Sequence, residues 1–286
     1  SAVPTYAVSQ LARQDVAMVL SGDGADEAFA GYGRYARWLN DSVALDVKSF
    51  LRSPKRLLRR VAAWIQHGVT TQRCLRWETQ FVGVLHQEAR RSIWRSDYWP
   101  LLQERCPAFA TAAAEARHWD RLSFAQFLDQ QTYLPGDILT KVDIASMQHG
   151  LEVRTPFCDV RVMEFAATLP MSEKVAPEMR PCQMKWLPKR ALRKTFAATF
   201  VDRKKQGFAI PEAQWLRAGT PVRRCLDDLL ATRASAMFDY LERDAVLGVM
   251  RRFDEQGREA TALWSLFSLA LWFEGLSSTE VLQEAA

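Results

Sequence analysis

Several features that define other protein classes are missing from this 286-residue chain. Glycine (13 residues) and proline (12 residues) are not enriched, and we find no low-complexity segment and no internal repeat. These absences argue against long disorder and against a repeat architecture. The composition, 48% hydrophobic and 25% charged, is that of a globular protein with enough apolar side chains for a core.

The chain also has few residues that bind metals or form crosslinks. Its five cysteines are widely spaced, odd in number and without a C-x-x-C pair, and its four histidines are scattered. This pattern favours reduced thiols in a cytosol over a disulfide framework or a zinc site. We therefore expect a cytoplasmic protein.

No apolar run reaches the roughly 20 residues that a membrane-spanning helix needs. The most apolar stretch covers residues 262–273 and is interrupted by Ser265 and Ser268, with Glu274 directly after it. We expect a buried core helix there and no membrane partner.

Acidic charge is in slight deficit, with a net charge of +5 and a pI near 9.0. Basic residues gather at 54–60 and 203–205, but acidic residues are interspersed nearly everywhere else. No aromatic residues interleave with the first cluster, which favours a solvated helix face over a nucleic-acid site.

One segment is typical of an open α/β sheet. Residues 16–20 form a continuous apolar run with β-branched members, as in a strand that is buried on both faces. The run leads into a glycine-rich turn at 21–24 and a helical segment from about Ala25. Ligands of such sheets bind at the carboxyl ends of the strands.

The other periodic segments are helical, and this is the one convincing strand. Helices are expected at 8–13, within 43–118, at 122–150 with a break at 134–136, at 160–169, after Pro188 and at 262–274. A single parallel strand cannot stabilise a sheet, so we expect its neighbours to come from sequence outside this chain or from a poorly ordered arrangement.

The turn itself, S-G-D-G-A-D-E-A-F-A-G-Y at 21–32, combines glycines with three carboxylates, Asp23, Asp26 and Glu27. Glycines and a helix N-terminus let backbone N–H groups approach an anion. Carboxylates facing a phosphate need an intervening cation, and Mg²⁺ is the natural one. The alternative is an ordinary helix start with acidic residues in its first turn.

Four more blocks follow in order. They are L-P-G-D-I-L-T-K-V-D at 134–143, L-E-V-R-T-P-F-C-D at 151–159, K-R-A-L-R at 189–193 and R-K-K-Q-G-F-A-I-P at 203–211. Together with the turn, they resemble the motifs of glutamine-hydrolysing asparagine synthetases. The resemblance spans about residues 1 to 217, and it is specific only because all the blocks occur together.

This resemblance implies an α/β fold of the adenine nucleotide alpha hydrolase-like (PP-loop ATPase) kind. The chain, 1–286, would be a truncated, helix-rich synthetase domain with a remnant parallel sheet. Such enzymes use ATP and Mg²⁺ to convert aspartate to β-aspartyl-AMP, from which ammonia displaces AMP. The implied partners are aspartate or a similar carboxylate, ammonia from a glutaminase domain that hydrolyses glutamine, and a second copy in a homodimer.

The resemblance also implies roles for residues of the turn. Ser21, Gly22 and Gly24 would line the adenylate, and Asp23 would lie close to the reacting acyl group. Asp26 would hold Mg²⁺ and pyrophosphate.

A lysine of the fourth block would complete this site. Lys189 would reach the phosphates, where a cation stabilises developing charge. Without the family, a surface lysine on a helix is an equal interpretation of Lys189.

The third block has a structural interpretation that we favour over a catalytic one. Glu152, Arg154 and Asp159 could form a buried ion-pair network that holds a turn. In that case, removing one partner would mainly cost stability.

Departures from the family's motifs limit the prediction. The S-G-G-x-D-S pyrophosphate loop and an N-terminal cysteine nucleophile are not in the chain, so we expect it not to complete the reaction unaided. Ala30 stands for a usual glycine and Cys158 for a usual leucine, and both look tolerable. The open alternatives are an amidotransferase for another carboxylate, in exopolysaccharide or metabolite assembly, a β-lactam-forming relative, and a non-catalytic scaffold.

Overall fold

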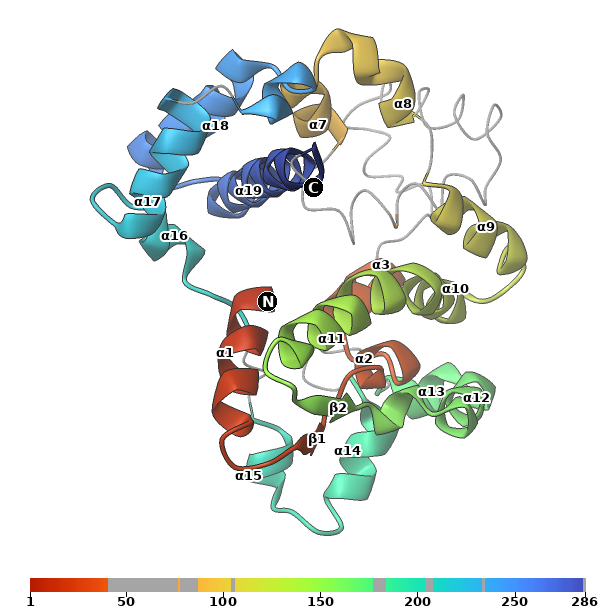
Figure 1. The fold of residues 1–286 in the computed structure, drawn as a ribbon. Coiled ribbons are helices and arrows are strands. Elements are labelled where there is room, and N and C mark those ends of the chain that lie inside the picture. Colours follow the sequence, from red (N-terminus) through yellow and green to blue (C-terminus); the bar gives the residue numbers. More distant parts are fainter. Residues whose placement is uncertain are drawn as a thin grey trace. The chain divides into compact units, whose positions relative to one another are not determined.

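The computed structural model describes residues 1–40, 77, 87–103, 106–176, 184–203, 208–232 and 235–284 (Figure 1). Much of the predicted helical segment 43–118, and the basic cluster 54–60, lie outside these residues. The chain divides into two compact units, Ser1–Phe81 with Cys106–Ala209, and Val82–Arg105 with Ile210–Ala286. We describe each unit by itself, and the single domain over 1–286 stays a prediction. In the described parts, no helix combines the length and apolarity needed to cross a bilayer.

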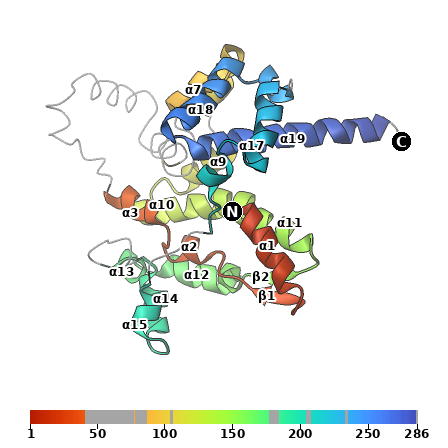
Figure 2. The same cartoon turned by 90° about the vertical axis from the view of Figure 1, so that its left-hand side faces the viewer.

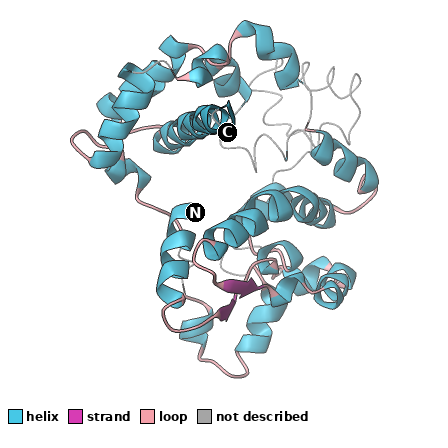
Figure 3. Cartoon of the chain, in the orientation of Figure 1, coloured by secondary structure: helices cyan, strands magenta, loops and turns pink. Residues whose placement is uncertain are grey.

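The first unit contains a small parallel sheet, drawn as arrows in Figure 3. Its strands are β1 (Met18–Leu20) and β2 (Glu152–Arg154), with Met18 opposite Glu152 and Leu20 opposite Arg154. Helix α1 (Ala2–Ala12) packs against α11 (Thr140–Met147). The predicted parallel strand is therefore confirmed, although it is shorter than 16–20.

Two expectations for this sheet were wrong. The strand at 16–20 was predicted to be buried on both faces, but Met18 is 40% and Leu20 67% exposed. Among the described residues β1 pairs with β2 alone, so its apolar side chains are only partly covered. The second wrong expectation was that the neighbouring strand lies outside this chain, since β2 belongs to it. Strand β2 was missed because two of its three residues are charged, which is unusual for a parallel strand.

The predicted break at 134–136 is also wrong. Helix α10 (Arg121–Leu128) continues through a π-helical segment, η3 (Asp129–Leu139), into α11. Pro135 lies inside η3, where the wider turn tolerates its missing N–H, and the Thr140 hydroxyl donates to the Pro135 carbonyl at 2.7 Å. One helical path therefore crosses the unit from Arg121 to Met147.

Shorter helices complete the first unit. They are α2 (Ala25–Ala28), α3 (Gly33–Asn40), α9 (Pro107–Glu115), η4 (Pro156–Cys158), α12 (Val160–Thr168), α13 (Met171–Lys174), α14 (Trp186–Leu192) and α15 (Ala198–Val201). The helix predicted at 160–169 is confirmed. The helix expected after Pro188 begins earlier, because proline is accommodated in a first turn, where its N–H has no partner to lose.

A small apolar cluster pins α2 in place. Ala28 and Phe29 are buried together with Ala166 of α12, and the Phe29 and Phe157 rings meet edge to face at 6.1 Å. The helix that follows the glycine-rich turn is thus packed against α12.

The described part of the second unit is built of helices, with one isolated antiparallel bridge between Trp94 and Leu241. Its elements are α7 (Gln87–Ile93), η2 (Ser96–Tyr98), α8 (Trp99–Gln103), α16 (Glu212–Trp215), α17 (Pro221–Leu226), η6 (Asp227–Thr232), η7 (Ala236–Asp239), α18 (Arg243–Gln256) and α19 (Ala260–Glu284). Figure 2 shows α19 as one long helix. The helix predicted at 262–274 is confirmed, with Leu263 and Phe267 in the core and Trp272 more than half exposed.

Candidate active site

The glycine-rich turn lies at the carboxyl end of β1, as predicted. The Ser21 N–H donates to the Arg154 carbonyl at 2.9 Å, which extends the ladder by one residue. The Ser21 hydroxyl donates to Asp23 Oδ2 at 2.7 Å and accepts from the Asp23 N–H at 3.3 Å. Ser21 thereby fixes the direction of the Asp23 carboxylate.

The two glycines of the turn are needed for different reasons. Gly24 has φ +86°, and a Cβ there would lie 2.6 Å from Cys158 Sγ, so both the backbone and the close approach require glycine. A Cβ on Gly22 would have no heavy atom within 4 Å. The surface at Gly22 is open, which leaves room for a ligand to contact the backbone.

Helix α2 does not begin like an ordinary capped helix. Its N-cap is Gly24, and no side chain caps the first turn. Asp26 instead pairs with Lys185, whose Nζ lies 3.1 Å from Asp26 Oδ1, with side chains 22% and 29% exposed. Asp26 therefore faces a cation beside the open part of the turn.

Gly31 makes this ion pair possible. A Cβ on Gly31 would lie 1.9 Å from Asp26 Oδ1 and 2.2 Å from Lys185 Cε. The Gly31 N–H also donates to the Asp26 carbonyl at 2.8 Å. The preceding residue, Ala30, has φ +56°, the left-handed region that favours the glycine it replaces.

Lys185 is the residue that the sequence analysis missed. Lys185 precedes α14 with φ +57°, a left-handed backbone conformation that is sparsely populated for lysine. The predicted Lys189 lies one turn further along α14, with Nζ 3.8 Å from Asp202 Oδ1. Because Lys185 and Lys189 are four residues apart, sequence spacing alone does not separate them. The role of Lys189 stays a prediction.

Glu27, the third carboxylate of the turn, is buried and structural. It accepts from the Tyr32 hydroxyl at 2.6 Å, and burial raises its pKa above the ordinary glutamate value. Gln126 of α10 donates to two backbone carbonyls of α2, those of Glu27 at 2.6 Å and Ala28 at 2.9 Å. The last carbonyls of α2 are thus tied to α10.

A buried polar cluster supports the segment that follows α2. Asp129 accepts from the Tyr35 hydroxyl at 2.5 Å, Arg34 Nη2 at 2.8 Å and Trp77 Nε1 at 3.1 Å. The Arg34 guanidinium lies 4.1 Å from the centre of the Tyr32 ring. These contacts fix α3 against η3, so the segment that follows the glycine-rich turn is held in place.

The predicted buried network at 152–159 is wrong in two respects. Arg154 and Glu152 do form an ion pair at 2.7 Å, but their side chains are 62% and 56% exposed. Asp159 is not part of it and pairs with Arg161 at 2.9 Å, where hydrogen bonds from Arg161 lower the Asp159 pKa to about 2. Glu152 and Arg154 are two residues apart in β2, so both side chains lie on the same, exposed side of the strand. The sequence alone did not indicate this exposure.

The carboxylates suit a metal that is shared with a ligand rather than a protein-made cage. Among the described residues, no group of three or more His, Cys, Asp or Glu side chains is placed to hold a metal. Mg²⁺ commonly takes one or two carboxylates together with phosphate oxygens and water. Asp26, with Asp23 on the same turn, fits that ligand set.

Comparisons with known proteins agree with the motifs. The chain matches the family model described as asparagine synthase over residues 1–274. It is 27% identical to glutamine-hydrolysing asparagine synthetase 1 of Bacillus subtilis, over 95% of this chain and 42% of that protein. It is 29% identical to a Mycobacterium tuberculosis protein with a provisional name of the same kind, over 94% and 41%. The chain thus spans about two fifths of the length of these relatives.

Proposed function

This chain belongs to the asparagine synthase family, and on that premise we propose that it forms the nucleotide-activating part of an ATP-dependent amide-forming enzyme. Family membership supports ATP-dependent amide formation as the class of reaction. We propose the finer assignment as well: aspartate is converted to asparagine through β-aspartyl-AMP, with ammonia derived from glutamine. The chain would have the PP-loop ATPase fold of such synthetases.

The observation that carries the proposal is the Asp26–Lys185 pair beside an open glycine turn at the end of a parallel strand. The two side chains are 3.1 Å apart and partly exposed, so an incoming ligand can reach both. Pyrophosphate with Mg²⁺ is a ligand of matching chemistry: its metal needs carboxylate oxygens and its phosphates need a cation. Asp26 would hold the metal, and Lys185 would bind phosphate oxygens.

For the remaining residues of the turn we propose the roles that the family resemblance implies. Ser21, Gly22 and Gly24 would line the adenylate, and the open surface at Gly22 supports this role for that residue. Asp23, oriented by Ser21, would lie near the reacting acyl group. Lys189, on the turn of α14 after Lys185, would add positive charge for the phosphates.

Isotope exchange between pyrophosphate and ATP tests this proposal. The assay uses a protein that carries this chain at its relatives' full length, with aspartate and other carboxylates as acceptors. We expect aspartate-dependent exchange that falls at least a hundredfold in Asp26→Asn and Lys185→Met, since lost charge stabilisation at a transition state costs about 2.7–4 kcal/mol.

The outcomes separate the alternatives. Exchange that depends on another carboxylate would replace aspartate as substrate and keep the reaction class. Absence of exchange with every carboxylate, in a protein that melts cooperatively, would favour the scaffold alternative. Normal exchange in both variants would show that the Asp26–Lys185 pair is not the phosphate site.

A further inference from the structure

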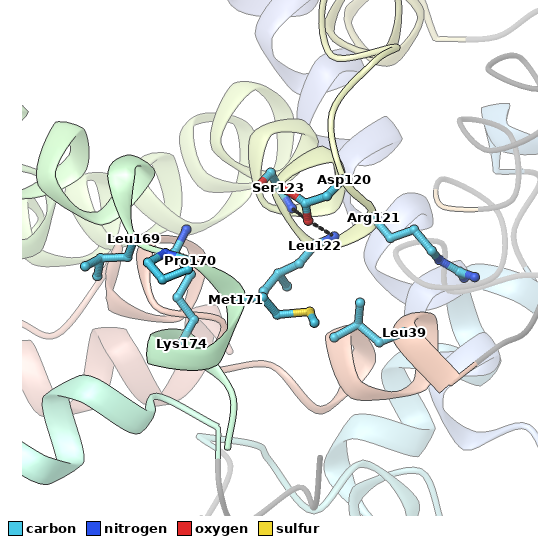
Figure 4. Close-up of a pocket in the computed structure, with 9 residues that line it drawn as sticks. All are labelled: Leu39, Asp120, Arg121, Leu122, Ser123, Leu169, Pro170, Met171 and Lys174. Atoms are coloured by element: carbon cyan, nitrogen blue, oxygen red, sulfur yellow. Dashed lines mark hydrogen bonds between the residues drawn. The ribbon is translucent and has the colours of Figure 1, made fainter. Parts of the chain in front are cut away.

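A cavity of about 340 Å³ lies in the first unit, apart from the glycine-rich turn (Figure 4). Three elements form it: the end of α3 at Leu39, the start of α10 at residues 120–123, and residues 169–174 around the start of α13. Its volume is within the range of small-molecule sites, which begins near 300 Å³. Most of its walls are apolar.

One of the residues that line the cavity, Lys174, carries a buried ammonium. Lys174 is only 4% exposed, and its Nζ donates to Gln126 Oε1 at 3.1 Å. An ammonium has three donors, and within the described part of the chain no ion pair with a carboxylate compensates this one. Burial holds the pKa of Lys174 below the ordinary lysine value, which is the effect of an incompletely compensated charge.

The nearby carboxylate has other partners. Asp120 caps α10, accepting from the N–H groups of Leu122 at 2.9 Å and Ser123 at 3.1 Å. Although burial opposes them, hydrogen bonds from Ser123 hold the pKa of Asp120 below its usual range. Asp120 acts on Lys174 through its charge, and among the described residues no hydrogen bond or ion pair joins the two side chains. The ammonium therefore has donors left for an anion from outside.

We propose that this cavity binds a small organic monocarboxylate, whose carboxylate pairs with Lys174 and whose hydrocarbon part packs on Leu169, Pro170 and Met171. A buried cation needs a paired anion to offset its desolvation, and a charge-assisted hydrogen bond supplies that pairing. The apolar walls favour a short aliphatic body over a polar one. The acid Asp120 beside the cavity disfavours a dianion. This site is independent of the proposed activity at the glycine-rich turn.

Calorimetric titration with isovalerate tests the proposal, with isovaleramide as the neutral analogue of the same shape. We expect saturable isovalerate binding to this chain, and amide binding at least tenfold weaker. Lys174→Met should abolish the preference for the acid. Lys194→Met, which removes an exposed lysine of the same unit, should leave binding unchanged.

A second variant tests the cavity without touching the charge. Met171 is 48% exposed at the cavity wall, so Met171→Trp should fill the space without disturbing the core. We expect it to lose isovalerate binding and to keep the wild-type melting temperature. Equal affinity for acid and amide, undiminished binding in Lys174→Met and Met171→Trp, or no binding to the wild-type chain would each overturn the proposal.

Discussion

Replacing Gly31 with alanine should separate the function of the glycine-rich turn from its stability. The added Cβ would lie 1.9 Å from Asp26 Oδ1 and 2.2 Å from Lys185 Cε, so the ion pair must open. Both clashing atoms belong to side chains that are partly exposed and can move towards solvent. The backbone of Gly31 has an ordinary φ, so alanine causes no strain there.

The two effects differ in size. Losing a partly exposed ion pair costs about 0–1 kcal/mol of stability. Alanine returns about 0.4–1 kcal/mol by reducing the freedom of the unfolded chain. The net free energy of unfolding should therefore change by less than about 1 kcal/mol. A displaced carboxylate and ammonium, in contrast, should lower the rate of adenylate formation about 10²–10³-fold.

The assay is aspartate-dependent exchange between pyrophosphate and ATP, measured beside thermal melting. Gly33→Ala is the matched control, because a Cβ on Gly33 meets no heavy atom within 4 Å. Gly33 begins α3, and alanine there should be silent or slightly stabilising. If Gly31→Ala exchanges as fast as Gly33→Ala, the Asp26–Lys185 pair has no part in the chemistry. If Gly31→Ala fails to fold, the side chains of Asp26 and Lys185 cannot move aside for the added Cβ.

Three further substitutions follow from the contacts. Asp120→Ala removes the cap of α10 and should lower the free energy of unfolding, measured in urea, by about 1 kcal/mol. Because the pKa of Asp120 is lowered in the folded state, this stabilisation is present above pH 3.8 and should vanish as the pH falls through the folded-state pKa. Glu152→Gln opens an exposed pair with Arg154 and should change stability by no more than about 1 kcal/mol, far below the loss expected of a buried pair. Arg223→Met removes a nearly buried guanidinium that donates to Asp254 at 2.8 Å, and should destabilise the second unit by about 2 kcal/mol in the same assay.

Local patterns predicted the parts of the fold that depend on local physics. The strand before the turn and the helices predicted at 160–169 and 262–274 follow from the periodicity of apolar residues, although the second helix extends further, over Ala260–Glu284. The strand β2 does not, because its charged residues become a strand only by pairing with β1. Pro135 was expected to end a helix, but it lies inside the π-helical segment η3, through which the helical path continues.

Sequence analysis identified only the acidic side of the proposed site. Asp23 and Asp26 are recognisable because they occur in one continuous motif. The cation that pairs with Asp26, Lys185, is far away in the sequence and contacts Asp26 only because of the fold. No local sequence feature distinguishes Lys185 from Lys189, so only the fold shows which of them pairs with Asp26.

The amide of Gln126 has a consequence for the order in which this protein folds. It joins α10 to the carbonyls of Glu27 and Ala28, which lie 99 and 98 positions earlier in the chain. Contacts of such separation require a long loop to close first, and they form late unless a nucleus already holds both ends. The short helix α2 has only four residues and cannot persist alone. The acidic turn should therefore gain its shape after α10 has docked, so that a newly made chain completes the geometry of its proposed phosphate site among the last steps of folding.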